Sequence, residues 1–219
     1  MTEKDSDTLR TAFDAIWRYI ADQKDKIHGK SIEVPEFVPS PARDTDTPTE
    51  SRYGTDFAVL RHVESAFDLA RQFKTAEIAE LLASALPLIR WSQNPNYTEA
   101  KCSRSLLDGY AYAAMGGPDG PIECAAPRGG IMLMGPHVTY PDHFHSPREV
   151  YLVLTPGAQW RLDEGEWFDV EPGDLLFHDA WQMHATRTAD QPLLAFAGWI
   201  EPGERLSIDW GKGSTAIAN

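Results

Sequence analysis

The sequence is poor in cysteine, in basic residues and in long apolar runs, and each shortage excludes a class of protein. Only two cysteines occur, Cys102 and Cys124, without zinc-ribbon or C-x-x-C spacing, so neither a disulfide framework nor a structural zinc site is predicted. Lys and Arg number 20 against 33 Asp and Glu, which argues against binding nucleic acid, because phosphates require clustered cations. No apolar run of about eighteen residues and no N-terminal apolar segment occurs, so we expect a soluble, cytoplasmic protein without a membrane span.

The first part of the chain has the pattern of amphipathic helices. Apolar residues recur at helical spacing within residues 7–24 and 56–73, and a third helix is expected over 76–86. Between the first two, residues 26–52 are rich in Pro, Ser, Thr and Asp, which is typical of an irregular linker. We therefore predict that residues 1–94 form a helical region with a Pro-rich linker that packs on the rest of the chain and supplies no catalytic group.

From residue 95 onward, short β-like runs alternate with turns that contain Gly and Pro. The first run is L-L-D-G-Y-A-Y-A-A-M at residues 106–115, and the last is L-L-A-F-A-G-W-I at residues 193–200. This spacing favours a small antiparallel barrel or sandwich over residues 95–219, with an interior that holds one small ligand. The predicted fold class is mainly β with an N-terminal α-helical region.

The stretch richest in chemistry is Y-P-D-H-F-H-S-P-R-E-V-Y at residues 140–151. His143 and His145 are two residues apart, as are Glu149 and Tyr151, and alternate side chains of a strand share a face. Pro147 lies between the two pairs and can interrupt the pleat there. Each pair is therefore expected to point to one side.

A later histidine completes a candidate metal site. His184 ends the segment E-P-G-D-L-L-F-H-D-A-W-Q-M-H at residues 171–184. Three histidines and one carboxylate form a mixed N/O ligand set that suits divalent Fe, Zn, Mn, Co or Ni. We predict that one such ion is bound by His143, His145, Glu149 and His184.

The patterns H-x-H-x3-E and P-G-D-x9-H resemble the two motifs of the cupin superfamily. The departures affect turns and not ligands: Gly135 lies further upstream than the usual glycine, Gly157 is displaced by one residue, and Asp179 and Trp181 stand where proline and glycine are usual. The resemblance implies a single cupin, a small antiparallel β-barrel also called a double-stranded β-helix.

Within that superfamily, the combination of D-G-Y-A-Y, G-P-D-G-P and Y-P-D-H-x-H-x-P-x-E-x-Y looks like the cupin dimethylsulfoniopropionate lyases, of the DddL-like type with an N-terminal helical region. This resemblance implies a metal-dependent carbon–sulfur lyase: a base removes the proton next to the carboxylate, dimethyl sulfide departs and acrylate remains. Because a sulfonium leaves as a neutral thioether, the reaction needs a base and stabilisation of charge on the carboxylate side. The implied partner is one small zwitterionic substrate.

Aromatic residues supply the other candidates. Tyr140 and Tyr151 match the tyrosines of the family motif; a phenol has a pKa near 10, so a nearby metal cation is what makes such a base credible. We favour Tyr140 as the base, because Tyr151 lies two residues from Glu149 and close to the expected metal. Rings attract a sulfonium, and the candidates for a substrate-binding wall are Tyr110 and Tyr112 with Trp160, Trp181 or Trp199. For His178, a supporting or surface role is favoured over metal ligation.

Two other functions remain open. The same ligands suit Fe(II) in a mononuclear iron dioxygenase acting on a small carboxylate, and a cupin can also bind a metal or ligand without catalysis. The native metal and the oligomeric state are open as well, with a homodimer as one option.

Overall fold

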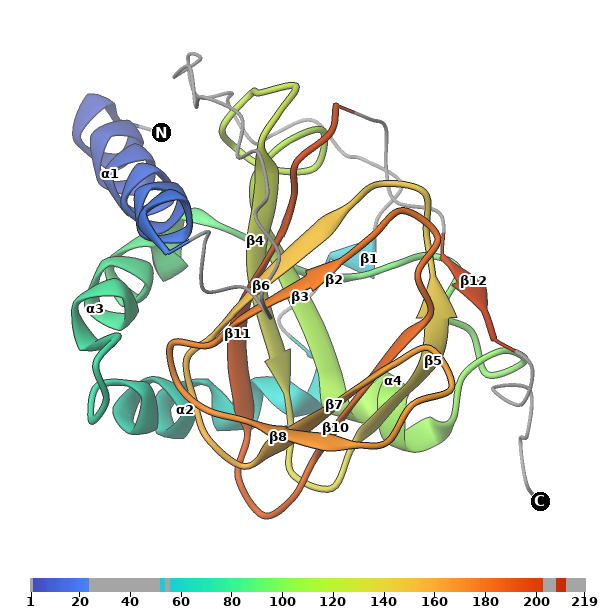
Figure 1. The fold of residues 1–219 in the computed structure, drawn as a ribbon. Helices are drawn as coiled ribbons and strands as arrows, with labels where there is room; N and C mark the ends of the chain where they lie inside the picture. Colours follow the sequence, from blue (N-terminus) through green and yellow to red (C-terminus); the bar gives the residue numbers. More distant parts are fainter. Residues whose placement is uncertain (1, 24–51, 54–55, 203–207, 212–219) are drawn as a thin grey trace.

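The structure is a computed structural model that describes residues 2–23, 52–53, 56–202 and 208–211. Two antiparallel sheets face one another, and helices cover the outer face of the larger sheet (Figure 1). The mainly β fold with N-terminal helices is therefore confirmed. The predicted linker at residues 26–52 lies, apart from its last residue, outside the described residues.

Within the described residues, the larger sheet has seven strands in the order β1-β2-β3-β4-β11-β6-β9, and the smaller has five in the order β12-β5-β10-β7-β8. The strands of the larger sheet are β1 (Arg52–Tyr53), β2 (Trp91–Gln93), β3 (Tyr110–Gly116), β4 (Arg128–Met134), β11 (Leu193–Trp199), β6 (Glu149–Val153) and β9 (Leu175–His178). Those of the smaller sheet are β12 (Asp209–Trp210), β5 (Thr139–Phe144), β10 (His184–Thr188), β7 (Ala158–Leu162) and β8 (Phe168–Val170). Both sheets contain only antiparallel pairs among these strands.

The helices begin and end close to the predicted limits. Helix α1 starts earlier than expected because Thr2 and Asp5 form a capping box, in which the Thr2 side chain accepts from the Asp5 backbone N–H at 3.2 Å. The expected single helix at 56–73 is split into a 3-10 turn and a short α-helix. The helical elements of this layer are α1 (Glu3–Asp22), η2 (Ala58–His62), α2 (Val63–Ala70), α3 (Ala76–Ala85) and η3 (Leu86–Leu88).

The larger sheet is buried on both faces, and alternate residues of its strands serve different cores. In β4, Ile131 and Leu133 pack with the helices, whereas Met132 and Met134 face the interior between the sheets. On the helix side, the ring of Phe196 lies 5.7 Å from that of Trp17, centroid to centroid. The helices thus cover the back of the sheet that carries the interior-facing site residues.

Two details differ from the sequence-based expectation. The run that was expected to begin a strand at residue 106 first forms helix α4 (Arg104–Gly109), because the Ser103 side chain accepts from the Leu106 backbone N–H at 3.2 Å and caps a helical turn. Strands β1 and β2 precede residue 95 yet pair into the larger sheet, so a division between 94 and 95 cuts through that sheet.

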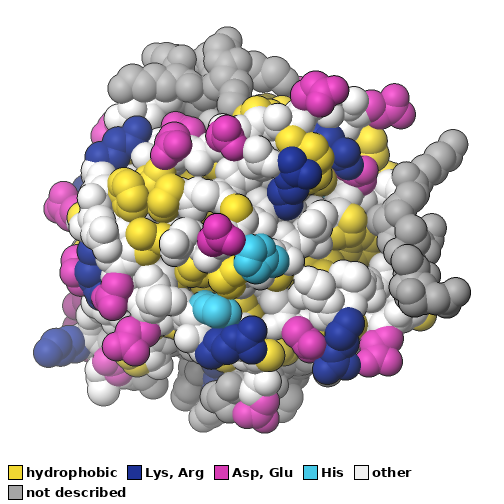
Figure 2. Space-filling view, turned by 90° about the horizontal axis from the view of Figure 1, so that it is seen from below, with side chains coloured by type: hydrophobic (Ala, Val, Ile, Leu, Met, Phe, Trp, Pro, Cys, Tyr) yellow, Lys and Arg dark blue, Asp and Glu magenta, His cyan; other side chains and the backbone are white. Residues whose placement is uncertain are grey.

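The surface carries both signs of charge. On the face shown in Figure 2, Asp and Glu side chains lie among Lys and Arg side chains. Among the described helices, none combines the length and the apolar character that crossing a bilayer requires.

Candidate metal centre

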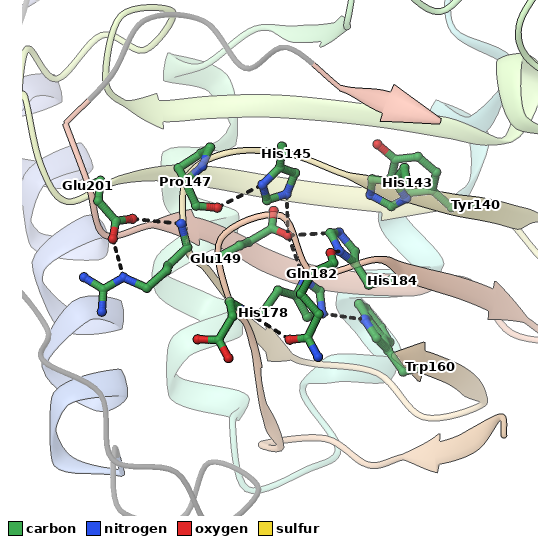
Figure 3. Close-up of polar contacts among 12 residues, drawn as sticks. Tyr140, His143, His145, Pro147, Glu149, Trp160, His178, Gln182, His184 and Glu201 are labelled. Carbon is green, nitrogen blue, oxygen red and sulfur yellow. Dashed lines mark hydrogen bonds and ion pairs between the residues drawn. The ribbon is translucent and has the colours of Figure 1, made fainter. Parts of the chain in front are cut away.

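Four predicted ligands come together at one end of the space between the sheets. His143 lies on β5 and pairs across the smaller sheet with His184, the first residue of β10. His145 follows β5 directly, and Glu149 is the first residue of β6 in the larger sheet. All four side chains are buried, at 2% exposure or less, and Figure 3 shows His145, Glu149 and His184 near one another, with His143 beside Tyr140 at the edge of the group.

Among the described residues, three of these four side chains lie close enough together to hold one metal ion. The Nε2 atom of His145 lies 3.1 Å from Oε2 of Glu149, and the Nε2 atom of His184 lies 3.3 Å from the same oxygen. One donor atom from each of the three falls within 4.8 Å of the others. His143 completes the cluster with its ring centroid 4.1 Å from that of His184.

Each of the three clustered histidines is oriented by a backbone carbonyl. A carbonyl oxygen only accepts hydrogen bonds, so Nδ1 carries the proton and the Nε2 lone pair is left to face the site. The bonds are from His143 to Pro141 at 2.8 Å, from His145 to Pro147 at 2.9 Å and from His184 to Gln182 at 2.9 Å.

The donor set fits a metal ion. The Nε2 atom of His184 is buried and has no hydrogen-bond partner among the described residues, although a carboxylate lies beside it. Burial removes this nitrogen from water without supplying a hydrogen bond, which costs free energy unless another group, such as a metal ion, binds its lone pair. A divalent cation at this point would be coordinated by imidazole nitrogen and carboxylate oxygen, as N/O metal sites require.

His178 is a supporting residue of this centre. Its Nδ1 atom donates to Oε2 of Glu149 at 3.0 Å, and its Nε2 atom accepts from the indole N–H of Trp160 at 3.2 Å. The ring is 0% exposed and stacks on His184 at 3.7 Å. Both nitrogens are therefore engaged, so His178 orients the carboxylate, and the surface alternative for this residue is wrong.

The charges of the centre favour a cation. Burial by itself would raise the pKa of Glu149, but the charge of His145 and hydrogen bonds from the neighbouring histidines outweigh it and hold that pKa well below its usual range. Burial and the nearby His184 lower the pKa of His143 well below its ordinary value, and the same causes lower the pKa of His178 to about 3. Near pH 7 the imidazole of His143 is neutral beside an ionised carboxylate, the protonation state that metal ligation needs. At His145, burial is outweighed by the charge and hydrogen bond of Glu149, which raise the pKa of that imidazole, so an ion that binds there displaces a proton.

A cavity adjoins the centre, and tyrosines form much of its wall. Tyr140 stacks on His143, with ring centroids 4.0 Å apart and planes 10° apart. Its hydroxyl shares a hydrogen bond with that of Tyr97, and its ring lies 5.2 Å from that of Tyr110. Tyr97 was not identified from the sequence, because it lies in the irregular segment N-P-N-Y, which has no periodic pattern.

Tyr151 also lines the cavity and projects from the same strand as Glu149. Its ring lies 5.0 Å from that of Trp160. Burial, followed by nearby tyrosine hydroxyls or the Glu149 charge, raises the pKa of both Tyr140 and Tyr151 well above 10. Without a cation, neither phenol would ionise near neutral pH.

The structure corrects part of the predicted substrate wall. Tyr110, Tyr112 and Trp199 line the cavity. Trp160 is fully buried behind the site, where it donates to His178. Trp181 is 59% exposed and lies in the loop after β9, where its ring contacts Phe144 and not the cavity.

The two facing sheets form a cupin-type barrel, and a cluster of three histidines and one glutamate at one end of it is a candidate metal site. Residues 40–195 match the family model described as dimethylsulfoniopropionate lyase. That match covers more than half of the chain, so the protein belongs to the dimethylsulfoniopropionate lyase family. The family resemblance inferred from the motifs is thereby confirmed.

Individual relatives agree with this assignment. The chain is 27% identical over 124 residues to the dimethylsulfoniopropionate lyase DddQ of Ruegeria pomeroyi, covering 57% of this chain and 61% of that protein. It is 29% identical over 150 residues to the putative dimethylsulfoniopropionate lyase DddL of Cereibacter sphaeroides, covering 68% of this chain and 62% of that protein. The matched segments thus span less than two thirds of each curated relative.

Solved structures share the fold. The crystal structure of DddQ from Ruegeria pomeroyi superposes with a TM-score of 0.70 at 22% identity, over 95% of this chain and 97% of that one. A structure from a study of the lyases RdDddP and RnDddQII gives a TM-score of 0.71 at 22% identity, over 95% and 98% of the two chains.

Proposed function

We propose that this protein is a metal-dependent carbon–sulfur lyase that cleaves dimethylsulfoniopropionate to dimethyl sulfide and acrylate by base-catalysed β-elimination. The observation that carries the proposal is the Tyr140 phenol stacked on His143 at the edge of a convergent N/O donor set. Family membership and the names of the curated relatives support the substrate.

The proposed metal ligands are His143, His145, Glu149 and His184, and the donor set suits divalent Fe, Zn, Mn, Co or Ni. When bound, the ion supplies positive charge that stabilises the charge developing on the carboxylate side of the substrate. His178 supports this site by holding the Glu149 carboxylate, in the way that outer hydrogen bonds fix metal ligands.

Tyr140 is the proposed base. Its phenolate oxygen accepts the proton from the carbon next to the carboxylate, the released electron pair forms the C=C bond, and the C–S bond breaks to give neutral dimethyl sulfide. Holding a phenol of ordinary pKa ionised at pH 8 costs about 2.7 kcal/mol, and burial of Tyr140 adds to this cost. A hydrogen bond donated by Tyr97 to the phenolate oxygen lowers it, since bonding to a charged form favours that form.

Tyr151 and the cavity rings position the substrate. Tyr151 projects into the cavity beside Glu149, within the region where the substrate must meet the metal. Tyr110, Tyr112 and Trp199 present rings to the same space, and each ring contact with a sulfonium is worth about 0.5 to 2 kcal/mol. The cytoplasmic location stays a prediction from the sequence, and a homodimer stays one option for the oligomeric state.

The experiment is to incubate metal-loaded protein with dimethylsulfoniopropionate without oxygen or added reductant, and to quantify dimethyl sulfide by headspace gas chromatography and acrylate by liquid chromatography. We expect equal amounts of the two products. Turnover that requires oxygen would support the iron dioxygenase instead. Substrate binding without turnover with every one of the five metals would support a non-catalytic cupin.

A further inference from the structure

Gln93, the last residue of β2, is a buried amide in the wall of the cavity. It is 3% exposed, and its Nε2 atom donates to the backbone carbonyls of Leu107 and Tyr110 at 2.7 Å each. Because carbonyl oxygens only accept hydrogen bonds, these two contacts determine which end of the amide is nitrogen. They therefore also fix the direction of its oxygen.

The amide oxygen of Gln93, Oε1, is available to a ligand. None of the described residues donates a hydrogen bond to it, yet it is not one of the fully buried side-chain atoms without a partner. Oε1 therefore keeps some accessible surface, and the space beside Gln93 is the cavity. An acceptor held rigidly at its nitrogen end is a fixed dipole, the kind of group that orients small ligands in mostly apolar sites.

The amide lies on the side of the proposed base that is remote from the metal ligands. The Tyr140 ring stacks 4.0 Å from that of His143, and the Tyr110 ring lies 5.2 Å from that of Tyr140. In the larger sheet, β4 and β11 separate β2 and β3 from β6, the strand that carries Glu149. The order along the cavity is thus metal ligands, Tyr140, Tyr110 and Gln93.

This end of the cavity is also distant from a fixed positive charge. Arg128 is the only Lys or Arg among the described residues that line the cavity. It begins the seven-residue strand β4, whereas Met134, which pairs with Tyr110, ends it about 20 Å away. Repulsion of a cation by the guanidinium is therefore weakest near Tyr110 and Gln93.

We infer that Oε1 of Gln93 positions the dimethylsulfonium group of the substrate and selects for a positively charged end group over a neutral one. This inference rests on the proposed function and deepens it. With the carboxylate at the metal ligands and the sulfonium at Gln93, the carbon that loses its proton lies between them, beside Tyr140. A sulfonium has no N–H or O–H donor, so its polarised methyl groups meet the amide oxygen through C–H···O contacts.

The contact also affects the course of the reaction. When the C–S bond breaks, its electron pair stays on sulfur, which becomes neutral, and the attraction to Oε1 weakens. Gln93 therefore stabilises the bound substrate at least as much as the transition state, and the neutral thioether is free to leave. Loss of such an interaction raises KM more than it lowers kcat.

The test compares two ligands of the same shape. In 4-methylpentanoate a neutral CH group replaces the sulfur cation of dimethylsulfoniopropionate, while the carboxylate and the chain length are kept. Affinity of the metal-loaded protein for 4-methylpentanoate is measured by isothermal titration calorimetry. Affinity for dimethylsulfoniopropionate is read as KM if dimethyl sulfide is released, and by the same calorimetry if it is not, because the compound then stays intact.

The variants are Gln93→Met and Gln93→Lys, with Ser92→Ala as the matched control. Ser92 is the neighbouring residue of β2, also lines the cavity, and donates from its hydroxyl to the Tyr112 carbonyl at 3.0 Å. Losing this bond disturbs the same strand without removing the amide oxygen. Any loss of affinity in Ser92→Ala should therefore be equal for the two ligands.

Gln93→Met removes the oxygen and should weaken dimethylsulfoniopropionate about twofold to fivefold relative to 4-methylpentanoate, the effect of losing a C–H···O contact. Gln93→Lys keeps N–H donors for the two carbonyls, so it is the variant to interpret if Gln93→Met folds poorly. Its ammonium repels the sulfonium and should weaken dimethylsulfoniopropionate more than tenfold relative to the isostere.

An unchanged ratio of the two affinities in either folded Gln93 variant would overturn the inference, because Gln93 would then serve only to bind the two backbone carbonyls. A ratio that falls as much in Ser92→Ala as in Gln93→Met would also overturn it. If wild type releases no dimethyl sulfide but the Gln93 variants shift the ratio in calorimetry, the proposed reaction fails and the sulfonium-selective contact stands. If turnover is normal and the ratio is constant, the reaction stands and this inference fails.

Discussion

Replacing Tyr140 with phenylalanine removes the hydroxyl of the proposed base and keeps its ring. The ring stack on His143 does not involve the hydroxyl, so the metal content of the variant should match wild type. Loss of a general base lowers kcat by about 10² to 10⁴, which corresponds to about 3 to 5 kcal/mol of transition-state stabilisation.

The same substitution has a calculable effect on stability. The hydroxyls of Tyr97 and Tyr140 bond to each other, and the two side chains are 1% and 2% exposed. Removing one partner leaves the other hydroxyl buried without this bond, at up to about 1 to 3 kcal/mol, or about 2 to 4 °C in Tm per kcal/mol for a chain of this size. Tyr97→Phe breaks the same bond from the other side and is the matched control. The double variant Tyr97→Phe/Tyr140→Phe should recover part of the loss, because neither hydroxyl then remains.

The assay measures kcat by headspace gas chromatography, metal content by elemental analysis and Tm by calorimetry for the three variants. Tyr97→Phe should lose stability about as Tyr140→Phe does, yet keep far more turnover. If Tyr140→Phe keeps more than about a tenth of wild-type kcat, less than the smallest expected loss, Tyr140 is not the base. If Tyr97→Phe loses as much kcat as Tyr140→Phe, the hydrogen-bonded pair and not one hydroxyl is responsible.

Tyr151→Phe should raise KM more than it lowers kcat, as expected for loss of a positioning contact; a fall in kcat alone at constant KM would contradict this role. His184→Ala should lose the metal and nearly all activity, and normal metal content by elemental analysis together with normal turnover would refute its ligation. His178→Phe should weaken metal affinity about tenfold to a hundredfold by freeing the Glu149 carboxylate, measured by competition with a chelator. In metal-free protein, His178 has a pKa of about 6.5 in the unfolded chain and of about 3 in the native state. The stabilisation from neutral His178 is therefore fully present above about pH 6.5 and falls by about 1.4 kcal/mol for each pH unit between about pH 6.5 and pH 3. Urea unfolding at pH 7, 6 and 5 should show this decline in the free energy of unfolding.

The ligands on β5 and β6 were predictable because their arrangement is mostly local. Two-residue spacing places His143 and His145 on one side of the strand. Because Pro147 can interrupt the strand, the direction of Glu149 relative to these histidines was not predictable from spacing. The structure shows that this proline turns the chain between the two strands and that its carbonyl accepts from Nδ1 of His145. The residue that interrupts the strand also orients the ligand, which spacing alone does not reveal.

The aromatic wall was less predictable because a ring's position depends on the packing of two sheets. Trp160 does point inward from β7, but at the level of His178, where its indole N–H is used in a buried hydrogen bond. Trp181 has a backbone φ of 63°, a left-handed conformation that turns the chain in a loop. Neither fact can be read from apolar periodicity.

Arg128 is a cavity residue whose position could not be predicted from the sequence. In the sequence it precedes the apolar run G-G-I-M-L-M, and a charged residue at the start of a strand ordinarily lies in solvent. Its place in the cavity arises from pairing between β4 and β11, strands that are separated by most of the barrel in sequence. The metal-ligand motifs are local in the sequence, whereas the place of Arg128 in the cavity wall depends on the order in which distant strands pair.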